Sequence, residues 1–449
     1  MEINYVEQKT ICLNMIVKDE SPIIEKTLEN ILSKIDIDYW VISDTGSSDN
    51  TREIITDFFL KRNIKGELHE DAWQGFGPNR TIALQHAYGK TDYVFMFDAD
   101  DKIVGDLNIN KLTLNCDQYD FKMGKSYTFM RPMLFNNHKK WKYIGVLHEY
   151  LSCLEPPITK TTFAGDYYIN ACTLGNRSLD PDKYKKDAEL LTNAYETEPE
   201  ISLKERYAFY AAQSFRDSSQ TDKSIEWYKL VLTLNNWAQE KYYSCLMLGK
   251  LYKSLNDFET AIKYFTLSYT YDKERIEGIV YACNMFYEKG QHMLVNAMYE
   301  RYKHITHESC DFSKKLFITS SCYNDELSYY NSVSSYYLQS FSSGYESCKR
   351  NIINGVIDKG RLYNALHNMA FYIGELKKDD DFLKLFSNVN KMMKDKCIEG
   401  DVVDAPSLVG DILYDKEKCV KRNIIDSEVM VWTALFEKYN KWLVDHTMQ

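Results

Sequence analysis

The chain has 449 residues, of which 44% are hydrophobic and 27% are charged, and its formal net charge is −10. The length is enough for roughly two to three domains, and the many apolar residues exclude a mainly disordered chain. The sequence has no run of about 18 apolar residues, so no membrane span is expected, and its acidic balance argues against nucleic acid as a partner.

The cysteines predict a reducing environment. Their number, 11, is odd, and no CxxC pair or Cys/His zinc spacing occurs. Free thiols are therefore the simplest interpretation. The first ten residues also lack the apolar run after a basic start that a secretory signal requires. Together these features predict a cytoplasmic protein.

The first hundred residues alternate between short apolar runs and helical patterns. Ser21 is expected to cap the first helix, with Pro22 in its first turn. Alternating strands and helices predict parallel strands joined by right-handed crossovers. Open sheets of this kind bind ligands at the carboxyl ends of their strands. The expected elements are strands at Ile11–Val17, Tyr39–Ile42 and Tyr93–Phe97, and helices that start at Ser21, span Thr51–Leu60 and span Pro78–Tyr88.

A run of acidic residues follows the third expected strand. Asp98, Asp100 and Asp101 are close enough in sequence to present several carboxylate oxygens together. Carboxylate oxygens are the ligands that hard divalent cations prefer. The alternative is a solvated turn at the end of a strand. The pattern alone leaves both open.

Two further polar positions lie at the same expected edge. Asp44 ends the second strand, where an acid accepts hydrogen bonds from a ribose or a base edge. The alternative is a helix cap, and for Asp49 we favour that alternative. Arg80 lies near the start of the third helix, where a guanidinium suits a phosphate. A surface ion pair is its alternative.

The second half of the chain is expected to be helical. Seven of the eight prolines fall at or before Pro199, and the next is Pro406. Similar segments then recur, because 37 residues separate Phe215 from Tyr252 and 34 separate Tyr252 from Phe286. This period, with its small and aromatic positions, resembles tetratricopeptide (TPR) repeats, and an ordinary helical bundle is the alternative. Such repeats bind peptides or another copy of the chain. The matching positions are Gly249, Tyr252, Ala261 and Phe265.

Four segments in fixed order resemble one enzyme family. ICLNMIVKDES, VISDTGSSDNTREI, WQGFGPNRTIAL and YVFMFDADD are similar to the GT-A-fold glycosyltransferases of the family 2 type, and more narrowly to those with C-terminal TPR repeats. The resemblance implies an α/β N-terminal GT-A domain, Rossmann-like with a mixed sheet, followed by an all-α TPR-like region. The expected boundaries are residues 1–185 for the GT-A domain, 186–308 for the repeats and 309–449 for a C-terminal helical extension.

The resemblance also implies a reaction and its residues. A sugar would move from a nucleotide-diphosphate donor, a UDP-sugar by family preference, to an acceptor hydroxyl with inversion. The implied catalytic base is Glu149 of the segment VLHEY. A divalent cation, Mn²⁺ or Mg²⁺, would be held by Asp98, Asp100 and His148. The implied nucleotide-binding residues are Asn14, Lys18, Asp44, Arg80 and Asp98.

One departure from the family pattern leaves a second function open. Family members often carry a histidine just before a Gly-x-Arg-Ser segment, but here the segment reads ACTLGNRS. Arg177, with Lys183 or Lys186 behind it, is a candidate to close over the diphosphate. The alternative is that Lys183 and Lys186 form the solvated face of the first linking helix. The first function is an enzyme whose acceptor is a glycan, a protein or a peptide. In that case the repeats either handle the acceptor or form a homodimer through the helical region. The second is a non-catalytic TPR scaffold with a degenerate transferase domain. A nucleotidyltransferase is set aside, because ICLNMIVKDES has no glycine for a phosphate loop.

Overall fold

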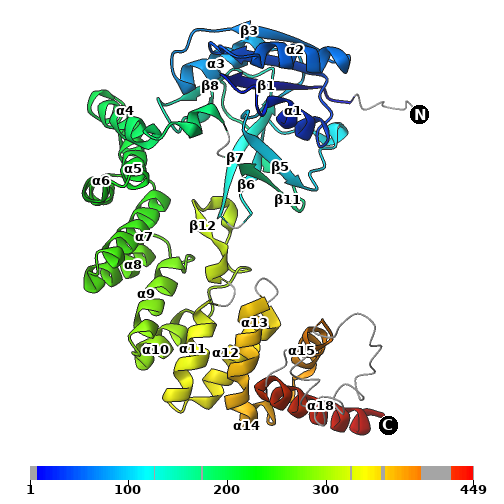
Figure 1. The fold of residues 1–449 in the computed structure, drawn as a ribbon, viewed down its shortest axis with the longest axis vertical. Coiled ribbons are helices and arrows are strands. Elements are labelled where there is room, and N and C mark those ends of the chain that lie inside the picture. The colour runs from blue at the N-terminus through cyan, green and yellow to red at the C-terminus, as the bar shows by residue number, and fades with distance from the viewer. Residues whose placement is uncertain are drawn as a thin grey trace. The chain divides into compact units, whose positions relative to one another are not determined.

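The computed structural model describes residues 8–125, 127–172, 175–323, 326–354, 359–395 and 426–447 (Figure 1). The chain divides into two compact units. The first consists of Met1–Leu251 and Phe312–Ile318, and the second of Tyr252–Asp311 and Thr319–Gln449. The large sheet and the first helices after it belong to the first unit.

The first unit begins as alternating strands and helices and ends as helices. Its elements are β1 (Ile11–Val17), α1 (Ile24–Leu32), β2 (Tyr39–Asp44), α2 (Thr51–Lys61), β3 (Lys65–Glu70), α3 (Phe76–Ala87), β4 (Tyr93–Met96), β5 (Asp101–Gly105), η1 (Lys111–Thr113), β6 (Gln118–Met123), β7 (Tyr127–Asn136), β8 (Trp141–Ile144), β9 (Tyr150–Cys153), β10 (Lys160–Thr162), β11 (Tyr167–Ala171), η2 (Asn176–Leu179), α4 (Lys183–Thr197), α5 (Ile201–Asp217), α6 (Thr221–Thr233) and α7 (Ala238–Ser254), in which the unit ends.

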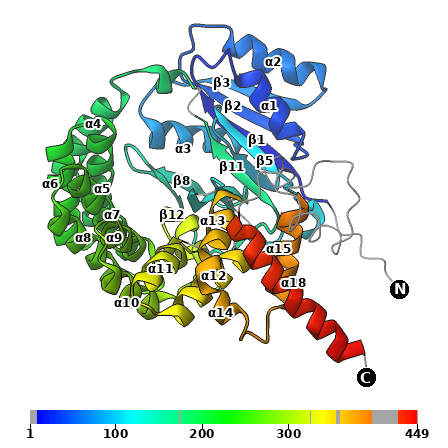
Figure 2. The ribbon, with the colours of Figure 1, turned by 60° about the horizontal axis from the view of Figure 1, so that its bottom comes forward.

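The sheet is mixed, as the sequence led us to expect. Its strand order is β3-β2-β1-β4-β7-β6-β11-β5. Strands β3, β2, β1 and β4 are parallel, whereas β7 is antiparallel to β4. Figure 2 shows α1 and α2 on one side of these parallel strands and α3 on the other. Both faces of β1 are therefore covered, so this strand reads as a nearly continuous apolar run. Ile11 and Leu13 join the core beneath α1 and α2, and Cys12 joins the core beneath α3.

Three local features differ from the sequence-based prediction. Ser21 does not cap α1, because the N-cap is Ile23 and it makes no side-chain capping bond. The Ser21 backbone N–H instead donates to Asp49 Oδ2, at 3.1 Å. Strand β3 was not predicted, because its sequence KGELHE has only one aliphatic residue. A low apolar content suits a strand at an end of the strand order, which is where β3 lies. Strand β5 was also not predicted, because it begins at Asp101 within the acidic run.

The second unit is mainly helical. Its helices follow α7 as α8 (Phe258–Tyr271), α9 (Glu277–Glu288), α10 (His292–Tyr302), η4 (Ser320–Tyr323), α11 (Glu326–Tyr337), α12 (Phe341–Asn354), α13 (Lys359–Met369), η5 (Ala370–Tyr372), α14 (Ile373–Leu376), α15 (Leu383–Asp395) and α18 (Asp426–Thr447). Residues 312–318 return to the first unit, with η3 at Phe312–Lys314, and β12 (Ile318–Thr319) pairs with β7. A region expected to be all helical thus contributes one short strand.

The repeat positions anticipated from the sequence lie at helix contacts. Ala261 and Phe265 on α8 are fully buried, and the Tyr252 and Tyr264 rings stack with centroids 5.7 Å apart. The nine cysteines within the described residues are all free thiols. Within those residues, too, no helix combines the length and apolarity needed to cross a membrane.

Gly278 allows α9 to pack closely on α8, and we predict that Gly278→Ala destabilises the protein. A Cβ at this position would lie 2.1 Å from Ser268 Oγ and 2.3 Å from the Phe265 carbonyl oxygen. Overpacking of this kind costs about 1–3 kcal/mol, measurable by urea unfolding. The control is Gly374→Ala, where a Cβ would have no heavy atom within 4 Å. Alanine there is expected to be neutral or to stabilise by up to about 1 kcal/mol. Equal stability of the two variants would contradict the prediction.

Candidate functional site

The carboxyl ends of β1, β2 and β4 meet at one edge of the sheet. Val17 pairs with Asp44 across β1 and β2, and Asn14 pairs with Met96 across β1 and β4. The turns after β1 and β2 are bonded to each other, because Asp19 Oδ1 accepts from the Ser48 backbone N–H at 2.7 Å. Asp44 and Asp98 therefore follow strands on either side of β1, at the same edge.

Asp44 presents an unsatisfied oxygen at this edge. Its Oδ1 accepts hydrogen bonds from the backbone N–H groups of Gly46 at 2.9 Å and Ser47 at 2.8 Å, where Gly46 has a φ of 103°. The residue is 1% exposed, and its Oδ2 is buried without a hydrogen-bond partner. A buried polar atom of this kind is costly unless something pairs with it. Oδ2 is therefore suited to accept an N–H or O–H from a ligand.

Five charged side chains form an alternating chain beside the same edge. Arg80 Nε on α3 donates to Glu149 Oε1 at 2.6 Å, and Arg80 Nη2 lies 2.5 Å from Asp98 Oδ1. Arg131 Nη1 on β7 donates to Asp98 Oδ2 at 2.8 Å and lies 3.7 Å from Asp101 Oδ2. We call Glu149–Arg80–Asp98–Arg131–Asp101 the ion-pair chain. Its Glu149 end is well shielded from solvent, since the Arg80 and Glu149 side chains are 7% and 8% exposed.

Within the ion-pair chain, the pKa of Asp98 is lowered and the pKa of Asp101 is raised. Burial opposes the charged form of Asp98, but the guanidinium groups of Arg131 and Arg80 outweigh it and hold the pKa of Asp98 well below its usual range. Burial and the Asp98 charge raise the pKa of Asp101 to about 8. The same two causes raise the pKa of Asp100, which accepts a hydrogen bond from the Gly175 backbone N–H. Asp98 is therefore ionised more readily than Asp100 and Asp101.

Glu149 and His148 lie on the five-residue loop between β8 and β9, residues 145–149. Two residues of this loop have left-handed backbone, Gly145 with a φ of 116° and His148 with a φ of 53°. The loop abuts the start of α3, because a Cβ on Gly77 would lie 2.5 Å from the Gly145 carbonyl oxygen. The His148 ring stacks on Tyr210 of α5, with centroids 4.0 Å apart. The loop thus lies between α3 and α5.

The predicted metal ligands Asp98, Asp100 and His148 do not form one cluster here. Within the described residues, no group of three or more His, Cys, Asp and Glu side chains is arranged to hold a metal ion. The physical reason lies at Asp98, since both of its carboxylate oxygens face an arginine.

Besides Asp44, two predicted nucleotide-binding residues, Asn14 and Lys18, lie outside the ion-pair chain. Asn14 is fully buried, and its amide donates to the carbonyl oxygens of Val41 at 2.9 Å and Ala83 at 3.0 Å. It joins β1 to β2 and α3 within the core. Lys18 follows β1 directly and is exposed. The structure therefore brings Arg80, Asp98 and Glu149 into direct contact and leaves Asn14 beneath the site.

The segment that follows β11 lies close to two acidic residues, Asp100 and Glu20. A Cβ on Gly175 would lie 2.9 Å from Asp100 Oδ2 and 3.2 Å from Glu20 Oε1. Arg177 lies over the Phe76 ring, 4.7 Å from its centroid, and forms an ion pair with Asp187. Of the two lysines named with Arg177, Lys183 and Lys186, Lys186 pairs with Asp180. Residues 173–174 of the segment that lacks the family histidine lie outside the described residues.

Sequence reasoning missed Arg131. It stands in the strand TFMRPMLF, and a lone arginine among apolar strand residues is a signal for an unseen acidic partner. The sequence did not identify that partner, Asp98, because 33 residues separate them. The α5 residues that contact the 145–149 loop gave no comparable signal, because aromatic residues at helical spacing usually belong to a core.

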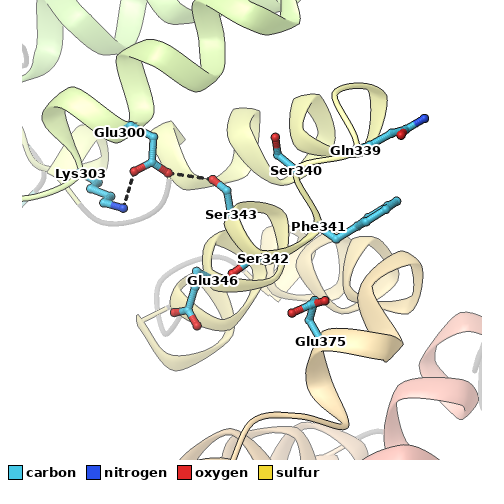
Figure 3. Close-up of a pocket in the computed structure, with 9 residues that line it drawn as sticks. All are labelled: Glu300, Lys303, Gln339, Ser340, Phe341, Ser342, Ser343, Glu346 and Glu375. Atoms are coloured by element: carbon cyan, nitrogen blue, oxygen red, sulfur yellow. Dashed lines mark hydrogen bonds and ion pairs between the residues drawn. The ribbon is translucent and has the colours of Figure 1, made fainter.

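A cavity of about 590 Å³ lies in the second unit, and none of its lining residues was predicted for the site (Figure 3). Glu300 on its wall accepts hydrogen bonds from Ser343 Oγ at 2.9 Å and Lys303 Nζ at 2.6 Å. Its lining residues are Glu300, Lys303, Gln339, Ser340, Phe341, Ser342, Ser343, Glu346 and Glu375.

Comparisons with known proteins match two parts of the chain. Residues 12–141 match the model of the family described as glycosyl transferase family 2, and residues 242–275 match a tetratricopeptide repeat. The structure is similar to a mannosyltransferase, PcManGT from Pyrobaculum calidifontis in complex with GDP-Man and Mn²⁺, at 13% identity over 59% of this chain and 76% of that one, with a TM-score of 0.32. It is also similar to S. aureus TarS 1–349 in complex with UDP, at 13% identity over 57% of this chain and 83% of that one, with a TM-score of 0.25.

Proposed function

From the family 2 glycosyltransferase domain that residues 12–141 form, we propose that this enzyme transfers a sugar from a UDP-sugar to an acceptor hydroxyl with inversion at the anomeric carbon. The observation that carries the proposal is the direct contact of Arg80 with both Asp98 and Glu149 at the carboxyl edge of the sheet. This contact joins three residues that the sequence placed far apart.

Glu149 is the proposed catalytic base. Arg80 Nε, 2.6 Å from its Oε1, fixes the direction of the carboxylate. A charged carboxylate takes the proton of the acceptor hydroxyl as that oxygen attacks the anomeric carbon. The bond from the anomeric carbon to the diphosphate breaks in the same displacement, and the proton ends on Glu149.

Asp44 is the proposed nucleotide contact. Its buried Oδ2 has no hydrogen-bond partner in the protein, so a nucleobase N–H or a ribose hydroxyl supplies the missing donor. Arg80 and Arg131 both place positive charge beside Asp98, which follows β4. They favour the approach of an anionic diphosphate. Lys18, which is exposed directly after β1, is a further proposed nucleotide contact.

A divalent cation, Mn²⁺ or Mg²⁺, is part of the proposal. The donor chemistry fits, because Asp98, Asp100 and Asp101 supply the hard carboxylate oxygens that such a cation prefers. Asp100 is the proposed main ligand, and Asp98 and His148 would join it only with a rearrangement, because the three do not form one cluster here. When bound, the cation would neutralise charge on the departing diphosphate.

Removal of the Asp100 carboxylate is expected to abolish metal-dependent nucleotide binding. With UDP at 100 times its Kd in the presence of Mn²⁺, the wild type gains about 2.7 kcal/mol of stability, and Asp100→Ala is expected to lose most of this gain. The measurement is thermal unfolding with UDP, with and without Mn²⁺. Asp106→Ala, at an exposed acid just beyond β5, is the control. Equal stabilisation of Asp100→Ala and the control would exclude Asp100 as a ligand.

The proposal as a whole is tested by donor turnover. Release of UDP is measured across a panel of UDP- and GDP-sugars, with Mn²⁺ or Mg²⁺ and with candidate glycan and peptide acceptors. Turnover with a UDP-sugar supports the proposal, and turnover restricted to GDP-sugars would contradict the choice of nucleotide. If no nucleotide binds and no donor turns over, the enzyme proposal is rejected in favour of the alternative function, a non-catalytic TPR scaffold.

A further inference from the structure

We propose that helix α5, the second helix after the sheet, is part of the active site: Arg206, Tyr207 and Tyr210 are positioning residues that hold the 145–149 loop. This inference rests on the proposed function, because Glu149 of that loop is the proposed base. It gives the helical region a direct task in sugar transfer, beyond the binding of an acceptor or of a second copy.

Three contacts join one face of α5 to the loop. Arg206 donates from Nε and Nη2 to the His148 carbonyl oxygen, at 3.1 and 2.8 Å. The Tyr210 ring lies parallel to the His148 ring, with centroids 4.0 Å apart and planes 10° apart. The Tyr207 hydroxyl accepts from the Val146 backbone N–H at 3.2 Å. Arg206 and Tyr210 are four residues apart and so share a face of the helix.

The loop needs such support because its backbone is strained. His148 has a φ of 53°, and a left-handed conformation costs a residue with a Cβ about 1–2 kcal/mol. Strain of this kind persists only where surrounding structure maintains it. His148 directly precedes Glu149, so relaxation of the His148 backbone would turn the Glu149 carboxylate away from Arg80. The contacts from α5 act at the strained residue itself.

The α5 side chains are themselves fixed. Tyr207 is 1% exposed and Tyr210 is 8% exposed. The Arg206 guanidinium lies over the Tyr210 and Tyr150 rings, 4.8 and 5.4 Å from their centroids. Its Nη1 lies 3.9 Å from Glu240 Oε1 of α7. Rigid supporting residues are what accurate placement of a catalytic group requires, since an error of about 1 Å costs about 100-fold in rate.

The test uses four variants of the full chain. Tyr210→Leu removes the stacked ring, Tyr210→Phe keeps it, and Arg206→Ala removes both hydrogen bonds to the His148 carbonyl. The control is Tyr195→Leu, which removes a ring contact between α4 and α6, where Tyr195 and Trp227 have centroids 5.2 Å apart. Two measurements are made on each: hydrogen–deuterium exchange of peptides that cover residues 145–150, and the kcat and KM for UDP-sugar turnover.

The proposal predicts a specific pattern. Tyr210→Leu and Arg206→Ala speed exchange over residues 145–150 and lower kcat by about 100-fold, while the donor KM stays within about twofold. Tyr210→Phe and Tyr195→Leu behave as the wild type in both measurements. Unchanged exchange in Tyr210→Leu and Arg206→Ala would overturn the proposal, and so would faster exchange with unchanged kcat. If the wild type itself turns over no donor, the proposed function fails, and exchange alone still decides whether α5 holds the loop.

Discussion

Glu149→Gln is expected to lower sugar transfer by about 10²- to 10⁴-fold while nucleotide binding persists. Glutamine matches glutamate in size, and its amide oxygen still accepts from Arg80 Nε, which lies 2.6 Å from Oε1 in the native protein. It cannot take up the acceptor proton. The kcat for UDP-sugar turnover is measured beside the thermal shift that UDP produces.

A matched control tests whether the effect of Glu149→Gln comes from loss of the base or only from loss of a negative charge near the β8–β9 pair. Glu155→Gln makes the same exchange just beyond β9, where Glu155 Oε2 accepts from the Lys140 backbone N–H at 3.3 Å. This variant is expected to keep wild-type turnover. If Glu149→Gln also kept wild-type turnover, Glu149 would not be the base and the attacking hydroxyl would need another proton acceptor.

Arg80→Met is expected to destabilise the protein by about 3–5 kcal/mol at pH 7, the range for a buried ion pair that loses one partner. The substitution leaves Glu149 without its cation, whereas Asp98 keeps Arg131. The unfolding free energy from urea titration measures the loss. The same variant is expected to lose affinity for UDP, since a positive charge near the proposed diphosphate position is removed.

The pH dependence of this loss has a defined direction. In the wild type, the lowered pKa of Asp98 gives stability that is present above the ordinary carboxyl pKa and is lost as the pH falls through the folded-state value. In Arg80→Met, the one buried carboxylate left without its cation takes up a proton more readily as the pH falls, and this removes the cost of its unpaired charge. The gap in unfolding free energy between the two proteins is therefore expected to narrow from pH 7 towards pH 4.

The control for Arg80→Met is an arginine in an exposed pair. Arg52 Nη1 lies 2.8 Å from Glu70 Oε2, and the Glu70 side chain is 72% exposed. Such pairs contribute about 0–1 kcal/mol, so Arg52→Met is expected to cost little. If Arg80→Met cost no more than Arg52→Met, the ion-pair chain would contribute no net stability.

Much of the first unit could be predicted from the sequence, because its central strands are covered on both faces. Strand β1 has the bounds expected from its continuous apolar run, Ile11–Val17, and β2 ends at Asp44 as expected. The pattern fails where a strand is polar, as in β3, or where it begins within a charged run, as in β5. The cap of α1 was wrong because the Ser21 backbone bonds to Asp49 of the neighbouring turn.

The candidate site could be predicted only in part. Asp44, Arg80 and Asp98 stood out by their positions at the expected ends of strands and the start of a helix, and Glu149 stood out through the family resemblance. Asn14 belonged to the same strand motif, but its amide is used by backbone carbonyl groups of the core. Contacts across long sequence separations, such as Arg131 with Asp98, leave no periodic signal. The domain boundaries at residues 185 and 308, the acceptor, a homodimer and the cytoplasmic location stay predictions.

The contacts between α5 and the 145–149 loop have a consequence for protein engineering. A chimeric enzyme that receives the sheet domain of another protein could be cut where strands give way to helices, here after β11. A cut at that point would separate the loop from Arg206 and Tyr210 and pair it with a foreign helix. A fusion joined after Asp217, where α5 ends, keeps loop and helix as one inherited module, and transplanted donor specificity should survive only in fusions of this second kind.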